Sequence, residues 1–68
     1  MRYPIVIENS GKNFAAYVPD RPGCVATANT LDAAKAEISK AIRFHIDGMI
    51  EDGLEIPMPT SNVEYVAA

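Results

Sequence analysis

The side chains best suited to catalysis are few and lie far apart in this 68-residue chain. His45 is the single histidine and Cys24 the single cysteine. A cysteine nucleophile needs an adjacent base, and a zinc site needs several Cys or His ligands at close spacing, which the sequence lacks. We therefore interpret His45 as a structural residue with a packed ring and one bonded nitrogen, and Cys24 as a small buried hydrophobe. We expect no metal ion and no cofactor.

The carboxylates allow a second kind of chemistry, because metal-dependent nucleases gather several acids around paired metal ions. Asp20 falls in a predicted loop, Glu8 on a predicted strand and Glu37 on a predicted helix. Nothing in the spacing of these three residues brings their side chains together. We predict that the chain is not an enzyme.

The formal net charge is −3, and the charges are unevenly distributed. Residues 1–43 carry six bases and four acids, whereas residues 44–68 carry five acids and no base. Tyr3, Phe14 and Tyr17 could stack on nucleotide bases, but no basic cluster accompanies them to hold a phosphate backbone. We expect no direct nucleic-acid binding, and the acidic half suits a basic protein partner.

The size of the chain predicts one domain, residues 1–68, of marginal stability. A domain this small buries only about 60% of the surface of its unfolded chain, and a single cysteine cannot form a disulfide within it. Oligomerisation in a reducing compartment is the expected source of extra stability. No apolar run reaches the ~20 residues of a membrane span and the N-terminus lacks a signal-peptide core, so we expect a cytoplasmic protein with no membrane contact.

Alternating apolar residues predict three strands, over Arg2–Asn9, Asn13–Val18 and Cys24–Ala28. Turn residues around Gly11 join the first two strands into a hairpin, and a stiff, proline-rich loop precedes the third. Pro4 cannot donate to a ladder, which favours an edge position for the first strand.

A helix is predicted from residue 31 to about residue 52. Thr30 is a suitable N-cap, and Gly53 fits the left-handed position that ends a helix, with Leu54 folding back on Met49. Spacing of three and four residues produces one apolar stripe: Leu31, Ala34, Ile38, Ile42, His45 and Met49.

Residues 62–67 alternate again and predict a fourth strand. The order β-β-β-α-β indicates an α+β fold with a single, mainly antiparallel sheet and one helix on a face. The other face of the sheet has nothing left to cover it, so we expect a second copy of the chain or a partner there. We predict a homo-oligomer, a dimer or a tetramer, with Phe44, which lies off the apolar stripe, as a second candidate contact.

Several spaced motifs resemble those of the HicB-like family. Residues 17–27 read YVPDRPGCVAT and contain a Pro-Asp-x-Pro-Gly-Cys loop, and residues 29–34 read NTLDAA, a Thr-Leu-capped helix start. The segments IRFHI at residues 42–46 and EDGLEIP at residues 51–57 are similar to the family as well. The resemblance covers about residues 2–60.

This resemblance implies a partial RNase-H-like fold without nuclease activity, in the antitoxin of a toxin–antitoxin pair. The implied partner is a HicA-type toxin, a small basic mRNA-cleaving protein with a double-stranded-RNA-binding-like fold. Many family members carry a C-terminal helix-turn-helix or ribbon-helix-helix, and we expect a stand-alone antitoxin lacking such a DNA-binding domain. A degenerate RNase-H-like hydrolase or a small-ligand-binding domain is the alternative.

Acidic residues gather at the end of the predicted helix, where the helix dipole disfavours each by about 0.3–1 kcal/mol. Arg43 can pair with Asp47 at i,i+4 spacing and offset part of this cost. A solvated helix end is the default interpretation, but a local cost without a local gain is where a functional surface is expected. Our candidate partner-binding surface combines this helix end with the proline-rich loop: Asp20, Arg21, Asp47, Glu51, Asp52 and Glu55.

Overall fold

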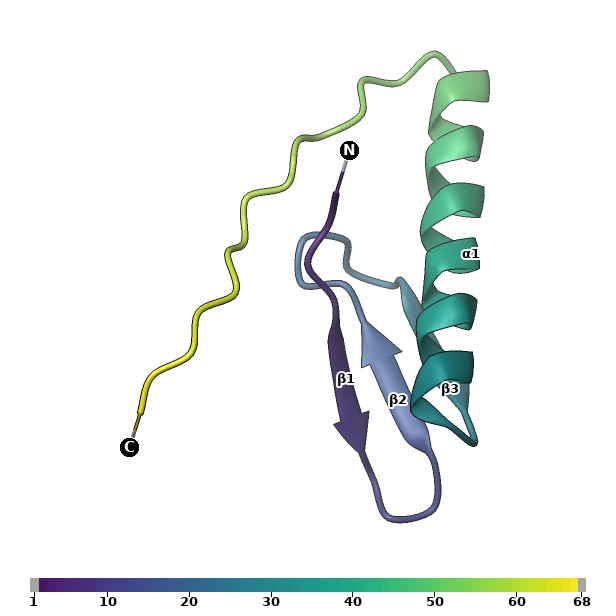
Figure 1. Ribbon diagram of the computed structural model, residues 1–68. Coiled ribbons are helices and arrows are strands. Elements are labelled where there is room, and N and C mark those ends of the chain that lie inside the picture. Colours follow the sequence, from purple (N-terminus) through teal and green to yellow (C-terminus); the bar gives the residue numbers. More distant parts are fainter. Residues whose placement is uncertain (1, 68) are drawn as a thin grey trace.

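Three short strands followed by one long helix form the regular structure of residues 2–67, which the computed structural model describes (Figure 1). The strands are β1 (Val6–Asn9), β2 (Phe14–Tyr17) and β3 (Val25–Ala28), and the helix is α1 (Leu31–Glu51). The sheet is antiparallel with the order β1-β2-β3, and α1 lies against one face. This arrangement confirms the predicted α+β class with one sheet and one helix. The partial RNase-H-like likeness stays a prediction.

The β1–β2 hairpin closes at the predicted turn. The Ser10 amide donates to the Asn13 carbonyl oxygen at 2.9 Å, and Gly11 has a φ of 91°, a conformation that favours glycine. The first strand is shorter than predicted because β2 ends at Tyr17, whose register partner is Val6. Residues before Val6 therefore extend past the end of the ladder, and β1 lies at the edge of the sheet, as predicted.

The covered face of the sheet packs on the first half of α1. Ala16 on β2 is the register partner of Ile7 on β1 and of Ala26 on β3, so these side chains share one face. The buried core comprises five residues from β2, the following loop and α1: Ala16, Val18, Cys24, Ala34 and Ile38. Cys24 is buried, as predicted.

The open face of the sheet carries an apolar row across all three strands. Tyr17 is the register partner of Val6 on one side and of Val25 on the other, on the face away from α1. Val25 is largely exposed and Tyr17 partly so. Within residues 2–67, no element covers this row.

Both ends of α1 are capped as predicted. The Thr30 hydroxyl accepts a hydrogen bond from the Ala33 amide at 3.1 Å. At the other end Gly53 has a φ of 71°, and the Leu54 amide donates to the Met49 carbonyl oxygen at 2.9 Å. This six-to-one bond is that of a Schellman motif, and it ends the helix at a glycine.

The helix is much longer than the sheet that it covers. Its 21 residues span roughly 32 Å, whereas a four-residue strand spans about 13 Å. The buried residues of α1, Ala34 and Ile38, both lie in its first half. His45, expected to pack on the apolar stripe, is exposed, so its predicted structural role is wrong. The sheet ends before the helix reaches His45.

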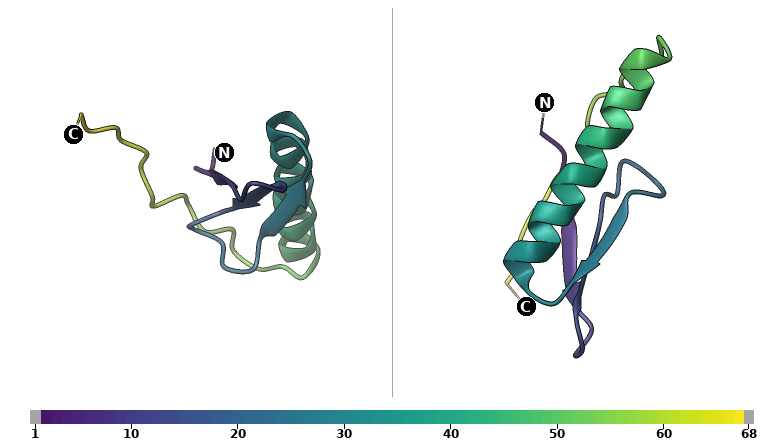
Figure 2. Two further views of the ribbon diagram at one scale, coloured as in Figure 1. Left: turned by 90° about the horizontal axis from the view of Figure 1, so that it is seen from below. Right: turned by 90° about the vertical axis from the view of Figure 1, so that its right-hand side faces the viewer.

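Residues 54–67, which we call the tail, contain no strand, so the predicted fourth strand is wrong. Figures 1 and 2 show the tail leaving the end of α1 and passing the N-terminal segment, after which its last residues run away from the helix and the sheet. The radius of gyration, 13.2 Å, accordingly exceeds the roughly 11 Å expected of a compact domain of this length. A strand needs a sheet edge within reach, and the last residues of the tail have none in this structure.

No helix within residues 2–67 combines the length and the apolarity that a membrane crossing demands.

Candidate protein-binding site

The loop between β2 and β3 is a closed turn that places two predicted site residues, Asp20 and Arg21. The Arg21 amide donates to the Val18 carbonyl oxygen at 3.0 Å, and the Cys24 amide donates to the Arg21 carbonyl oxygen at 3.1 Å. Gly23 has a φ of 92°, which turns the chain back into β3. These backbone bonds fix where the side chains of Asp20 and Arg21 emerge.

The Asp20 carboxylate binds the tail of its own chain. It accepts hydrogen bonds from the hydroxyls of Ser61 at 2.7 Å and Thr60 at 2.8 Å. The backbone amides of the same two residues also donate to it, at 3.0 Å from Ser61 and 3.3 Å from Thr60. The hydrogen bond from the Ser61 hydroxyl is the largest cause that holds the pKa of Asp20 below its ordinary value, because these donors favour the charged form.

A second contact holds the tail closer to the helix. The Tyr3 hydroxyl donates to the Pro57 carbonyl oxygen at 2.6 Å. We call the two contacts together, Tyr3 with Pro57 and Asp20 with Thr60 and Ser61, the tail latch. The latch joins the tail to the N-terminal segment and to the β2–β3 loop, through residue pairs that lie 40 to 54 residues apart in sequence.

Arg21 lies beneath the latch and is 8% exposed. Its Nη2 donates to the Met49 sulfur at 2.6 Å, and its guanidinium carbon lies 5.9 Å from the centroid of the Tyr3 ring. Its Nε is buried and has no hydrogen-bond partner within residues 2–67. A buried guanidinium with a thioether and an aromatic ring for neighbours is held by weak interactions. Arg21 thus contacts both Tyr3 of the N-terminal segment and Met49 near the end of α1.

The structure therefore separates the six residues predicted to bind a partner into two groups. Asp20 and Arg21 are engaged with the chain itself, so a partner role for them stays a prediction that requires the tail to move. Four residues are exposed at the end of α1 and just beyond it: Asp47, Glu51, Asp52 and Glu55. We call these four residues the acidic end.

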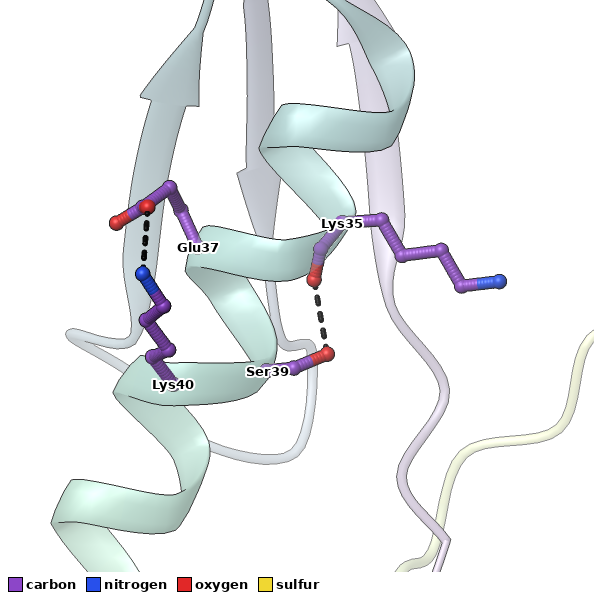
Figure 3. Close-up of polar contacts among 4 residues, drawn as sticks. All are labelled: Lys35, Glu37, Ser39 and Lys40. Atoms are coloured by element: carbon purple, nitrogen blue, oxygen red, sulfur yellow. Dashed lines mark hydrogen bonds and ion pairs between the residues drawn. The ribbon is translucent and has the colours of Figure 1, made fainter.

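The acidic end lacks internal neutralisation. The last turn of α1 contains no basic residue. The ion pair found within residues 2–67 joins Lys40 to Glu37 at 3.2 Å, in the middle of the helix (Figure 3). The Arg43–Asp47 pair that the spacing allows is not formed. The carboxylates at this end are therefore free to meet cations from another molecule.

Exposed apolar side chains accompany the acidic end. Phe44, the candidate oligomer contact, is 83% exposed on α1. Ile50 is exposed at the second-to-last position of α1, and Leu54 is exposed three residues after its end. Exposed apolar side chains beside these carboxylates make this surface a candidate for protein binding.

Groups of three or more His, Cys, Asp or Glu side chains able to hold a metal ion are absent from residues 2–67.

Residues 3–68 match the model of the HicB-like antitoxins of bacterial toxin–antitoxin systems. The chain therefore belongs to this antitoxin family.

Two relatives match nearly the whole chain. A 14.9 kDa protein encoded in the rep-hol intergenic region of Haemophilus phage HP1 is 41% identical over 66 residues, which are 97% of this chain and 50% of the relative. Antitoxin HicB 2 of Photorhabdus laumondii is 33% identical over 64 residues, which are 94% of this chain and 46% of the relative. The chain thus spans about half the length of these curated relatives. No solved structure matches it.

The sequence interpretation missed the tail latch. Asp20 was expected to face a partner, whereas Thr60 and Ser61 were given no role. A Thr-Ser pair just after two prolines was the available signal, since short hydroxyl side chains on a stiff segment suit a carboxylate acceptor. The spacing of 40 residues between acceptor and donors carries no pattern that would have joined them.

Proposed function

We propose that this chain binds and neutralises a small basic mRNA-cleaving toxin of the HicA type, in the cytoplasm and without catalysis of its own. Membership of the HicB-like antitoxin family and the relative named Antitoxin HicB 2 support an antitoxin role. The observation that carries the proposal is the acidic end, which combines four exposed carboxylates with no base in the last turn of α1.

The acidic end is unfavourable in the free protein and favourable in a complex. Carboxylates at the C-terminus of a helix meet the negative end of its dipole. A basic toxin supplies the missing cations, and opposite charges at the rim of an interface speed the encounter more than they strengthen the final contact. We therefore assign the acidic end to recognition of the toxin, with the exposed apolar side chains beside it as the contact that is buried.

We also propose that the free antitoxin is a homo-oligomer, a dimer or a tetramer. The row of Val6, Tyr17 and Val25 on the open face and the exposed ring of Phe44 are apolar surfaces that one chain does not bury. Light scattering at tens of micromolar tests this point, and a monomeric mass would contradict it.

The toxin-binding proposal is tested by charge reversal of Glu51 and Asp52 to Lys. We expect the double variant to fold with equal or slightly higher stability, because the helix dipole favours the new charges. Association with a HicA-type toxin should become slower and less sensitive to salt. Titrations at low and high salt, with thermal melts of each protein, measure both effects.

The matched control compares two single reversals that change the net charge equally. Glu51→Lys removes a carboxylate from the acidic end, whereas Glu8→Lys removes one from the exposed end of β1. Only the first should slow association. Unchanged affinity and unchanged salt dependence in the double variant would show that the acidic end does not face the toxin.

The absence of catalysis has its own assay. We expect the purified protein with Mg²⁺ or Mn²⁺ to leave single- and double-stranded RNA intact. RNA cleavage that Asp20→Asn abolishes would contradict the proposal and would point to a hydrolase instead.

A further inference from the structure

A groove of about 620 Å³ lies between α1, the residues before β1 and the start of the tail. Five isoleucines line it: Ile5, Ile42, Ile46, Ile50 and Ile56. Arg2, Lys35 and Arg43 line it as well, against one acid, Asp47. In a chain with a net charge of −3, this groove is a basic, apolar site.

The basic residues of the groove are not neutralised by ion pairs within residues 2–67, where the pair is Lys40 with Glu37. Figure 3 shows the Lys35 side chain on the other side of α1 from that pair. The positive charge of the groove is therefore free to meet a carboxylate. An occupant should be apolar and carry negative charge.

One segment of the chain has these properties and is itself unpartnered. Residues 62–67, which we call the arm, include Val63, Tyr65 and Val66, and the last two are 94% and 90% exposed. Glu64 is the only charged residue of the arm. Its alternating apolar pattern is that of a strand, yet the arm pairs with nothing in residues 2–67. Within residues 2–67, the arm has no segment to pack against and the groove has no segment that fills it.

The arm and the groove also agree in length. Six residues in extended conformation span about 20 Å. Lys35 and Ile50, which line the helical wall of the groove, are 15 residues apart, or roughly 22 Å along α1.

We propose that the groove receives the arm of a second copy of this chain. The tail latch anchors Thr60 and Ser61 to Asp20, and beyond this anchor the arm runs away from α1 in Figures 1 and 2. The latch thus directs each arm away from its own groove and presents it to a neighbour. Ile residues of the groove bury the arm's valines and its tyrosine, and the basic residues meet Glu64. This inference rests on the proposed self-association, and the groove shares Asp47 and Ile50 with the surface proposed to bind the toxin.

Disulfide cross-linking of the full-length chain tests the contact. Ser39 lines the groove and Val66 lies in the arm, so Ser39→Cys and Val66→Cys place one thiol on each side. Mixing the two variants under mild oxidation should produce a linked heterodimer, identified by its mass. Lys12→Cys, in the β1–β2 turn and outside the groove, mixed with Val66→Cys is the control and should link far less.

A chain that carries both Ser39→Cys and Val66→Cys distinguishes the source of the arm. Links between chains are expected, whereas a link within one chain would overturn the proposal, since the arm would then fill its own groove. Absence of any link above the control would overturn it as well. If light scattering still shows an oligomer in that case, self-association stands and only the arm–groove contact is wrong.

A charge placed in the arm gives a second readout. Tyr65→Asp should raise the dissociation constant of the oligomer by roughly tenfold or more, because it removes the aromatic side chain that the groove of the second copy is proposed to bury. Met58→Asp, an exposed position of the tail between the two contacts of the latch, should leave the constant unchanged. Equal effects of the two variants, or no effect of Tyr65→Asp, would overturn the proposal.

Discussion

The body of this antitoxin, residues 6–51, and its tail, residues 54–67, are held by different forces. The body is organised by burial: Ala16, Ala34 and Ile38 are almost completely enclosed between the sheet and the first half of α1. The tail has no buried residue and is held by the hydrogen bonds of the latch. Loss of apolar contacts should therefore destabilise the body, whereas loss of hydrogen bonds should release the tail.

This difference shows how a short chain can keep a surface available for partners. The strands are too short to cover α1, so the second half of the helix and the tail remain outside the core. Because the buried core contains no residue of the tail, we expect loss of the latch to free the tail without exposing the core. The body can therefore stay folded while the tail changes its position.

The largest expected effect comes from removing apolar volume from the body. Ile38→Ala should lower the free energy of unfolding by about 2–5 kcal/mol, because Ile38 is completely buried and its loss leaves a cavity. Leu54→Ala removes a similar volume from the start of the tail, where the side chain is exposed, and should cost about 1 kcal/mol or less. Urea unfolding of both variants makes the comparison, and equal losses would contradict the division into body and tail.

A smaller effect is expected at the start of α1. Thr30→Ala removes the hydroxyl that accepts from the Ala33 amide and should destabilise the body by about 0.5–2 kcal/mol. Thr27→Ala is the matched control, because it also deletes a threonine hydroxyl, but at an exposed position of β3 where it caps no helix. Chemical denaturation measures both, and a loss at Thr27 equal to that at Thr30 would argue against the cap.

Opening the latch should affect the tail alone. Asp20→Asn replaces a carboxylate by an amide that offers one acceptor oxygen to four donors. Amide hydrogen exchange at Thr60 and Ser61 should accelerate, whereas exchange in β2 should not change. Faster exchange in β2 as well would show that the latch supports the body.

The smallest expected effect is a pH dependence confined to the latch. The pKa of Asp20 is held below its ordinary value of 3.8 by the donors from Ser61 and Thr60. The charged carboxylate therefore stabilises the latch at pH values above 3.8, and this contribution disappears as the pH falls through the lowered pKa. NMR shifts of the Ser61 amide should titrate with a midpoint below 3.8 in the native chain and not in Asp20→Asn. A midpoint above 3.8 would contradict the geometry of the latch.

Local signals in the sequence predicted local structure well. The Gly11 turn, the Thr30 cap and the Gly53 helix end are each set by a residue and its near neighbours, and all three were confirmed. His45 was wrongly placed because a periodic stripe shows which side of a helix is apolar, not how far the opposing sheet extends. The arm was wrongly assigned to the sheet for a related reason, since an alternating pattern does not specify where a free edge lies.

The candidate site was predictable only in part. The exposure of Glu51 and Asp52 follows from their position at a helix end that no strand reaches. Burial of Arg21 does not follow, because it depends on Tyr3 and Met49, which are distant in sequence and meet only in the folded chain.

The sequence separations across the latch have a consequence for the order of folding. The two hairpins of the sheet join neighbouring segments, whereas the latch closes loops of 40 and 54 residues. Closing such loops costs more chain entropy than forming a hairpin, and few contacts repay it until the body is in place. We therefore expect the sheet and the first half of α1 to form first and the tail to dock last. In a stopped-flow refolding experiment on a chain in which Tyr17→Phe and Tyr65→Phe leave Tyr3 as the fluorescent tyrosine, the fluorescence should include a phase slower than the gain of secondary structure. Asp20→Asn should alter that phase alone.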